Sequence, residues 1–302
     1  MTFDLTNPVF SDAEKAREYL ESLHWPDGAV CPHCNLMNNT KVGGKTARPG
    51  LYMCNACRKQ FTVTVGTIFE DSKIPLNKWL LAFRLINGGK KGISANEIKR
   101  HLGISYKSAW FMMHRIREAM QDDGSPLGGP GKVVESDEAI VGGFKRKRLS
   151  GKIAPKKKIV TLVERGGSAR SFHITNITHK NVRHALVTSA HRSSVLMTDD
   201  ARFYNNIGRE FAEHHTTLHS NREFAKAGGI HSNTAENFFS IFKRGLVGTY
   251  HHMSAAHLHR YLVEFDFRYN TRKVSDAERT EEALKGARGK RLTYRQPSSL
   301  AA

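Results

Sequence analysis

Two cysteine pairs constrain the fold of this chain more than any other feature of its sequence. The four cysteines form two C-x-x-C pairs, Cys31 with Cys34 and Cys54 with Cys57, and residues 35–53 lie between the pairs. This spacing is typical of a zinc ribbon, in which each pair presents two thiolates from one turn and the two turns close a tetrahedron around the metal. Because four cysteine ligands leave no position for water, the pattern predicts one structural zinc ion. The alternatives are two redox dithiols or four inert buried thiols.

The composition excludes several classes of protein. Hydrophobic residues make up 39% of the 302 residues, which is ordinary for a globular protein with a sizeable core. No apolar run approaches the roughly 18 residues of a transmembrane helix, so we expect no membrane span. The first residues lack a basic stretch followed by an apolar one, so we expect no secretory signal. Lys and Arg number 47 against 28 Asp and Glu, a formal net charge of +19, which indicates nucleic acid as the partner.

Composition and periodicity divide the chain into four segments. Residues 1–70 hold all four cysteines and form the predicted zinc-ribbon domain, and residues 71–125 have the pattern of helices joined by short turns. Residues 126–274 alternate strand-like with helix-like stretches, and the Gly/Pro-rich residues 122–132 indicate a linker before them. Residues 275–302 are charged and then polar, so we expect a tail that is partly disordered.

The second segment contains the pattern of a helix-turn-helix. Ser94 followed by Glu97 predicts a capping box at the start of one helix. Gly103 can end that helix, and Ser105 can cap the next one. The alternative is a helical hairpin that packs only on its neighbours, but the excess of basic residues favours DNA contact. The residues predicted to contact DNA lie at the start of the second helix: Tyr106, Lys107 and Ser108.

Three acidic positions mark a candidate active site in the third segment. Asp137 lies within an apolar, strand-like run, where a charge is costly unless it is paired or bound to metal. Asp199 ends a second apolar strand, and Glu236 lies in a third, helix-like stretch. Considered singly, Asp199 could be a helix N-cap, and Glu236 could belong to a capping box with Asn233. Together, carboxylates from two strands and a helix can hold two Mg²⁺ or Mn²⁺ ions, the arrangement that serves phosphodiester chemistry.

Basic residues surround these acids in the sequence. Residues 144–158 contain eight Lys or Arg and no acid, and Lys243 follows Glu236 by two helical turns, on the same face. The basic run could be a solvated loop or a localisation-like signal, but beside a metal site it is better interpreted as a DNA clamp that neutralises phosphates. The residues of this run predicted to contact DNA are Lys145, Arg146, Lys147, Arg148, Lys156, Lys157 and Lys158.

The order of these parts resembles a known family, the zinc-ribbon DDE transposases of bacterial insertion sequences (the ISXO-like group). The resemblance covers about residues 20–272. It rests on CPHC and CNAC, on SAWFMMHRIR in the helical segment, and on VVESDEAIVGG, TDDARFY, HSNTAENFFSIFKRGLVGTYHH and HLHRYLVEFDFRYNTR in the third segment. It implies an α/β, RNase H-like catalytic domain, a mixed sheet flanked by helices, preceded by a zinc ribbon and a helix-turn-helix.

The resemblance also implies roles for individual residues. Asp137, Asp199 and Glu236 match the three metal-binding acids, on the first strand, at the end of the fourth strand and on a helix. Lys243 matches a basic residue that contacts DNA. Asn233, one turn before Glu236, is the alternative third member of the site.

The expected activity is metal-dependent cleavage and strand transfer at transposon ends. The partners would be double-stranded DNA, at transposon ends and target, and further copies of the chain, in the bacterial cytoplasm. Two rival functions remain at this stage. One is a non-catalytic DNA-binding regulator, and the other is an RNase H-like nuclease that cuts without joining.

Overall fold

The chain folds into two compact units. The computed structural model describes residues 4–44, 47–142, 156–217 and 229–294. The first unit comprises Met1–Gln121 together with Val274–Ala302, and the second comprises Asp122–Lys273. The division after Gln121 falls at the start of the Gly/Pro-rich stretch. The cysteine-bearing and helical segments therefore share one unit, and the C-terminal segment returns to it.

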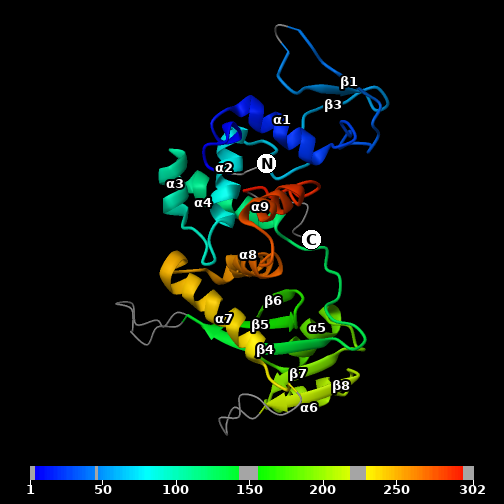
Figure 1. Ribbon diagram of the computed structural model, residues 1–302, viewed down its shortest axis with the longest axis vertical. Coiled ribbons are helices and arrows are strands. Elements are labelled where there is room, and N and C mark those ends of the chain that lie inside the picture. The colour runs from blue at the N-terminus through cyan, green and yellow to red at the C-terminus, as the bar shows by residue number, and fades with distance from the viewer. Residues whose placement is uncertain (1–3, 45–46, 143–155, 218–228, 295–302) are drawn as a thin grey trace. The chain divides into compact units, whose positions relative to one another are not determined.

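The first unit begins with a short 3-10 helix (Pro8–Phe10), a helix α1 (Ala13–His24) and a small antiparallel sheet (Figure 1). The side chain of Asp12 caps α1 by accepting hydrogen bonds from the backbone N–H groups of Glu14 and Lys15. The sheet has the order β1-β2-β3. Its strands are β1 (Asn39–Lys41), β2 (Tyr52–Cys54) and β3 (Gln60–Phe61).

Three helices of the first unit follow the sheet: α2 (Leu76–Asn87), α3 (Ala95–Leu102) and α4 (Tyr106–Ala119). The predicted capping box is confirmed, because Ser94 Oγ accepts from Glu97 N at 3.2 Å and Glu97 Oε2 accepts from Ser94 N at 2.9 Å. Gly103 ends α3 at φ 61°, a left-handed conformation that glycine adopts without steric cost. Ser105 caps α4 through Ser108 N, so the end of α3 and the start of α4 follow from the local sequence.

The C-terminal segment contains a helix that its sequence pattern did not predict. Within this charged segment, Asp276–Lys285 forms helix α9, which packs on α1, α2 and α4. Tyr19 Oη donates to Glu281 Oε1 at 3.0 Å, and Gly286 lies so close to α4 that an added Cβ would sit 2.2 Å from the carbonyl oxygen of Ala119. The helix was missed because it buries few apolar side chains, although its Ser275–Glu278 capping box was a readable signal.

The second unit is built on a five-stranded mixed sheet with the order β6-β5-β4-β7-β8. The central strand β4 pairs antiparallel with β5 and parallel with β7, and β5–β6 is antiparallel while β7–β8 is parallel. The strands are β4 (Val133–Val141), β5 (Lys157–Glu164), β6 (Ala169–Ile174), β7 (Val195–Asp199) and β8 (Glu213–Thr217).

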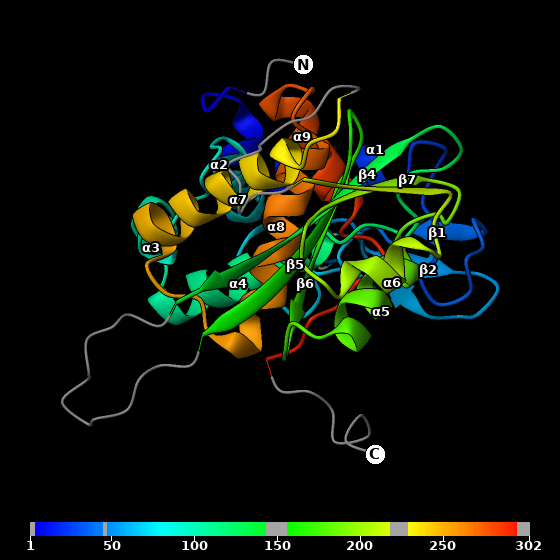
Figure 2. The same ribbon diagram turned by 90° about the horizontal axis from the view of Figure 1, so that it is seen from below.

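Helices cover both faces of this sheet (Figure 2). On one face α7 and α8 pack through Phe238, Phe242 and Phe265 against Ala139 and Val141 of β4. On the other face α5 and α6 form a second core that includes Val134 of β4. This arrangement confirms the predicted α/β class, a mixed sheet flanked by helices. The helices are α5 (His179–Ser189), α6 (Tyr204–Gly208), α7 (Asn233–Gly245), with a π-helical extension (Leu246–Tyr250), a 3-10 turn (Ala255–His257) and α8 (Leu258–Asn270).

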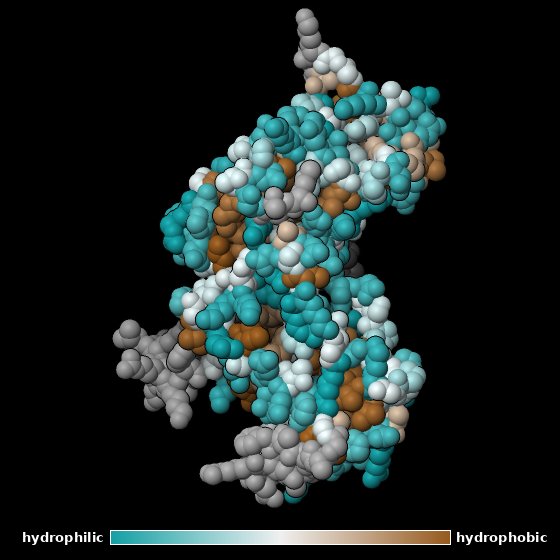
Figure 3. All heavy atoms as spheres, in the orientation of Figure 1, coloured by the Kyte–Doolittle hydropathy of each residue, from teal (hydrophilic) through white to brown (hydrophobic). Residues whose placement is uncertain are grey.

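None of the helices in the described part of the chain combines the length and the apolar character that crossing a bilayer requires. On the face drawn in Figure 3, hydrophilic residues cover most of the surface and apolar residues form scattered patches. The buried apolar side chains instead lie in the cores of the two units.

Candidate functional site

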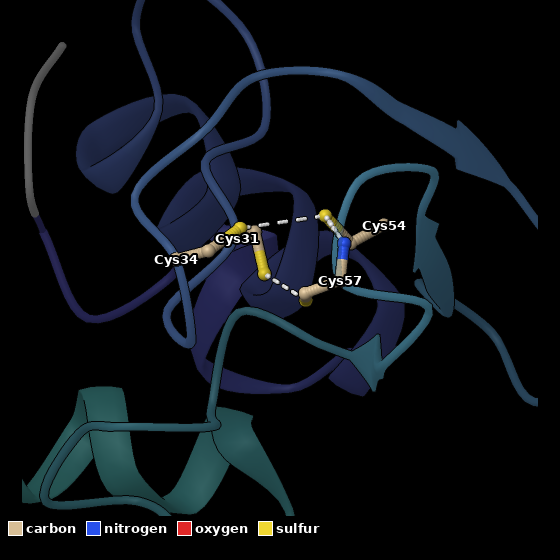
Figure 4. Close-up of side chains that lie close together, drawn as sticks. All are labelled: Cys31, Cys34, Cys54 and Cys57. Carbon is tan, nitrogen blue, oxygen red and sulfur yellow. Dashed lines mark hydrogen bonds between the residues drawn. The ribbon is translucent and has the colours of Figure 1, made fainter.

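The four cysteines converge on one point of the first unit (Figure 4). Their sulfur atoms all lie within 4.8 Å of one another. The Sγ atoms of Cys31 and Cys57 are 3.7 Å apart, and those of Cys34 and Cys54 are 3.6 Å apart. Thiolates at the usual Zn–S distance of about 2.3 Å in a tetrahedron are about 3.8 Å apart, so this spacing fits a zinc ion.

The two C-x-x-C turns have the same backbone geometry. Asn35 N donates to Cys31 O at 2.8 Å, and Arg58 N donates to Cys54 O at 2.9 Å. Both Asn35 and Arg58 have positive φ, 59° and 58°, directly after the second cysteine of each pair. Each of these two equivalent turns presents two sulfurs, so together they provide all four ligands of a four-cysteine site.

The surroundings of the cysteines suit a metal-bound thiolate. The backbone N–H of Cys57 donates to Cys54 Sγ at 3.5 Å, and this bond, together with those from Ala56 N and the neighbouring thiols, lowers the pKa of the Cys54 thiol to about 6. The pKa values of the Cys34 and Cys57 thiols are raised by burial and by hydrogen bonds among the thiols, so Cys54 is the one of these three that ionises first. All four cysteines are free thiols, and the rings of Trp25, Tyr52 and Phe61 pack around them. The predicted structural zinc site is therefore supported by the arrangement of its ligands.

Two of the three acids lie at the same end of neighbouring strands in the second unit. Glu135 of β4 pairs with Met197 of β7 in parallel, and this is the last pair of the β4–β7 ladder. Asp137 and Asp199 each lie two residues beyond this pair, so they follow the ladder on one face of the sheet. Asp199 Oδ1 accepts from Ala201 N at 3.1 Å, and α6 starts later with Phe203 as its N-cap, so Asp199 is not a helix N-cap.

Helix α7 brings the third acid to the same face. Glu236 lies in its first turn, and α7 packs against β4. Ser232 occupies the N-cap position and Asn233 the first helical position, so the Asn233–Glu236 capping box considered from the sequence does not form. The N–H groups of Thr234 and Ala235 bind instead to the carboxylate of Glu135 on β4, at 2.8 and 3.0 Å. Glu236 follows directly after these two residues.

The three acids nevertheless lie further apart than the cysteines do. Within the part of the chain that the structure describes, the cysteines form the only group of three or more His, Cys, Asp or Glu with ligand atoms within 4.8 Å of one another. Asp137, Asp199 and Glu236 therefore lie on neighbouring elements without meeting that limit. Ligands of two ions about 4 Å apart need not all lie so close together, so the spacing is compatible with a two-ion site.

A fourth acid, Glu138, lies next to Asp137 on β4. Its pKa is raised to about 8, mainly by burial and also by the charges of Asp199 and Asp137, while a hydrogen bond from Tyr204 opposes the shift, so this carboxyl is largely protonated at neutral pH. Tyr204 Oη lies between Glu138 and Ser136 Oγ, on the opposite face of β4 from α7. The sequence singled out Tyr204 only as the end of a motif, and this bond explains its position.

The predicted DNA-contacting residues of the second unit have different surroundings. Lys243 is exposed on α7, two turns after Glu236, and Lys156 is also exposed. Lys157 Nζ donates to Met253 O, and burial lowers its pKa, whereas Lys158 Nζ donates to Thr175 O at 3.1 Å. The remaining predicted residues lie outside the described part of the chain: Lys145, Arg146, Lys147 and Arg148.

The predicted DNA-contacting residues of the first unit lie at the start of α4. Tyr106 is half exposed and Lys107 is exposed, whereas Ser108 is partly buried and its N–H binds Ser105 Oγ at 3.1 Å. Lys107 Nζ lies 4.7 Å from the centroid of the Tyr294 ring, a cation–π contact that the sequence did not reveal.

Comparisons with known proteins agree with this arrangement. Residues 126–270 match the ISXO2-like transposase domain, and residues 11–60 match the transposase zinc-ribbon domain. A protein in the transposable element ISH50 of Halobacterium salinarum is 26% identical over 277 residues, which are 86% of this chain and 92% of that protein. The two domain matches cover the cysteine site and the acid-bearing unit, in the predicted order.

Proposed function

Because the chain belongs to the ISXO2-like transposases with a zinc ribbon, we propose that it catalyses metal-dependent DNA cleavage and strand transfer at the ends of a transposable element. The observation that supports the proposal is the parallel pairing of β4 and β7, which Asp137 and Asp199 follow at the same end, together with the packing on β4 of α7, whose first turn contains Glu236. The domain match adds an RNase H-like fold.

The donor set fits divalent cations. Asp137, Asp199 and Glu236 offer hard carboxylate oxygens, which Mg²⁺ and Mn²⁺ prefer. Bound cations would also offset the negative charge of the three carboxylates at this end of β4 and β7. Two such ions, when bound, activate a water and stabilise the leaving oxygen. The three carboxylates hold and space the ions, and their own negative charge disfavours a phosphodiester in the absence of metal.

The reaction consists of two displacements at phosphorus. In the first, a water oxygen bonds to phosphorus at the transposon end, the P–O3′ bond breaks, and the released 3′ oxygen takes up a proton. In the second, that 3′-OH loses its proton and attacks a target phosphodiester, whose own 3′ oxygen leaves. No covalent protein intermediate is required, so a Ser or Tyr nucleophile has no role.

Basic surfaces serve to bind the DNA in this proposal. Lys243 lies on the exposed side of the helix that carries Glu236, where it can neutralise a phosphate next to the acids. Exposed Lys107 and half-exposed Tyr106 lie at the start of α4, the helix that a helix-turn-helix inserts into the major groove. The residues proposed to contact DNA also include Ser108 and seven residues of the basic stretch: Lys145, Arg146, Lys147, Arg148, Lys156, Lys157 and Lys158.

Each segment of the chain has its own role in this function. Residues 1–70 and 71–125 recognise the transposon ends, residues 126–274 carry out the chemistry, and α9 of the final segment stabilises the first unit. Two DNA ends must be brought together, so we propose that the active form on DNA is a homo-oligomer. The site of action is the bacterial cytoplasm.

A strand-transfer assay tests the function. The purified chain is incubated with Mg²⁺, a labelled duplex containing the terminal sequence of the element, and a target plasmid. We expect both cleaved ends and joined products, and both should disappear in Asp137→Ala, Asp199→Ala and Glu236→Ala. Cleavage without joining would favour the nuclease, and DNA binding without either product would favour the regulator. If Asn233→Ala abolishes activity while Glu236→Ala retains it, Asn233 and not Glu236 is the third metal ligand.

A further inference from the structure

A buried ion pair lies beside the three acids but contains none of them. Glu135 has a fully buried side chain on β4, and its Oε1 accepts from Arg165 Nε at 2.6 Å. Glu135 is two residues before Asp137, so both side chains point to the face that α7 covers. Taking a carboxylate fully out of water is costly, so its partners carry information about its role.

The carboxylate of Glu135 is bound at the start of α7. Its Oε2 accepts from Thr234 N and Ala235 N, at 2.8 and 3.0 Å, and its Oε1 accepts from Thr234 Oγ1 at 2.8 Å. A carboxylate at this position satisfies helix N–H groups and interacts favourably with the helix dipole. It fixes the first turn of α7 against β4. Glu236 lies in this turn, directly after Ala235.

Arg165 extends the same network to β7. Its Nη2 donates to Met197 Sδ at 2.9 Å and to His231 O at 2.7 Å, and its Nη1 donates to Gly229 O at 2.7 Å. Met197 lies two residues before Asp199, and residues 229–231 lead into α7. The guanidinium therefore bonds to β4, to β7 and to the segment before α7.

We propose that Glu135 and Arg165 are positioning residues that hold β4, β7 and α7 at the spacing with which Asp137, Asp199 and Glu236 bind divalent ions. This inference rests on the proposed function. Asp137 is two residues from Glu135 itself. Asp199 is two residues from Met197, which Arg165 contacts, and Glu236 directly follows Ala235, which Glu135 contacts. The pair therefore acts on all three acids through short lengths of rigid backbone. Groups that orient metal ligands in this way change metal affinity by about tenfold to a hundredfold when they are removed.

A second buried ion pair in the same unit provides a matched control. Glu264 and Arg268 on α8 have side chains 0% and 7% exposed, and their charged atoms are 2.6 Å apart. Both residues lie on one helix, and Glu264 also accepts from Tyr250 Oη at 2.5 Å. Loss of this pair costs stability for the same reasons, but these bonds link α8 to the π-helical extension at the far end of α7 and not to the first turn of α7, where Glu236 lies.

The test compares Glu135→Gln, Arg165→Lys and Glu264→Gln in the full-length protein. Mn²⁺ binding is measured by electron paramagnetic resonance, with Asp137→Ala as the reference for the loss of the acid site. Hydrogen exchange of the α7 N-terminal amides and the Mg²⁺ dependence of strand cleavage are measured alongside. Arg165→Lys keeps a positive charge beside Glu135 but cannot make all the hydrogen bonds of the guanidinium. This variant tests the inference even if Glu135→Gln does not fold.

We expect Glu135→Gln and Arg165→Lys to weaken Mn²⁺ binding about tenfold or more. Cleavage should then require correspondingly more Mg²⁺, with its maximal rate largely restored at saturating metal, and the first amides of α7 should exchange faster. Glu264→Gln should leave the metal dependence unchanged even where it lowers the melting temperature. The inference is overturned if the folded Glu135 and Arg165 variants bind Mn²⁺ as the wild type does, or if Glu264→Gln weakens binding equally. If Asp137→Ala binds Mn²⁺ as tightly as the wild type does, the two-ion site itself is refuted, and the positioning role with it.

Discussion

The replacement Asp266→Asn should change how the stability of the second unit depends on pH. Asp266 lies on α8, buried against β6, and its carboxylate accepts from Ser171 N at 2.8 Å and from Ser171 Oγ at 2.6 Å. Its pKa is raised from 3.8 to about 7: burial and, to a smaller extent, the charge of Asp122 raise it, while the bonds from Ser171 and the charge of Arg170 oppose the rise. The folded protein therefore holds a proton on this carboxyl that the unfolded chain releases.

The sign and size of the effect follow from linkage. Because the pKa is higher in the folded state, the stabilisation is fully present below about pH 4 and is lost as the pH rises through about 7. A shift of about three units corresponds to about 4 kcal/mol once the pH is above both values. An asparagine stays neutral throughout and keeps one acceptor oxygen for Ser171. The variant should therefore gain on the wild type by up to about 4 kcal/mol between pH 4 and pH 8.

Hydrogen exchange measures this difference locally. The opening free energies of β6 and α8 peptides are compared between wild type and Asp266→Asn at pH 5 and at pH 8, so that intrinsic exchange rates cancel within each pH. Peptides of α2, in the first unit, serve as the internal control and should not differ. An equal difference between the two proteins at both pH values would refute the reasoning, because it would mean that the carboxyl has the same charge in the folded and unfolded states.

Three further predictions concern the first unit. Gly286→Ala should destabilise it by about 2 kcal/mol in urea unfolding followed by tryptophan fluorescence, because the new Cβ meets Ala119 O; unchanged stability would contradict the docking of α9. Cys54→Ser should abolish stoichiometric zinc in metal analysis and change the fluorescence of Trp25, which packs beside the cysteines; a variant that keeps one zinc ion and an unchanged spectrum would exclude the site. Lys107→Ala should lower the dependence of log Kd for DNA on log salt by about 1, and an unchanged slope would remove Lys107 from the interface.

Local sequence signals predicted the parts of this fold that depend on local chemistry. The C-x-x-C turns depend only on residues next to each cysteine, and the caps at Ser94 and Ser105 follow from hydrogen bonds within one turn. The acid positions were also readable, because charges within apolar strands are rare. The residue types favoured one shared site for the three acids, but the sequence could not show that β4 and β7 are neighbours, since that register is set by long-range contacts.

The remaining features depend on contacts between distant parts of the chain. Arg165 had no sequence signal, because it meets Glu135 only after β4 and β5 pair. Glu135 lies in the same apolar run as Asp137, but its partners at the start of α7 are about a hundred residues away in the sequence. Helix α9 was missed for a similar reason: its few buried side chains become informative only against α2 and α4.

Anomalous diffraction from crystals of the protein with a transposon-end duplex and Mn²⁺ tests the central claim most directly. The account predicts two manganese peaks about 3.5–4 Å apart, bound by oxygens of Asp137, Asp199 and Glu236. A DNA-bound structure in which saturating manganese gives no peak between these side chains would contradict it.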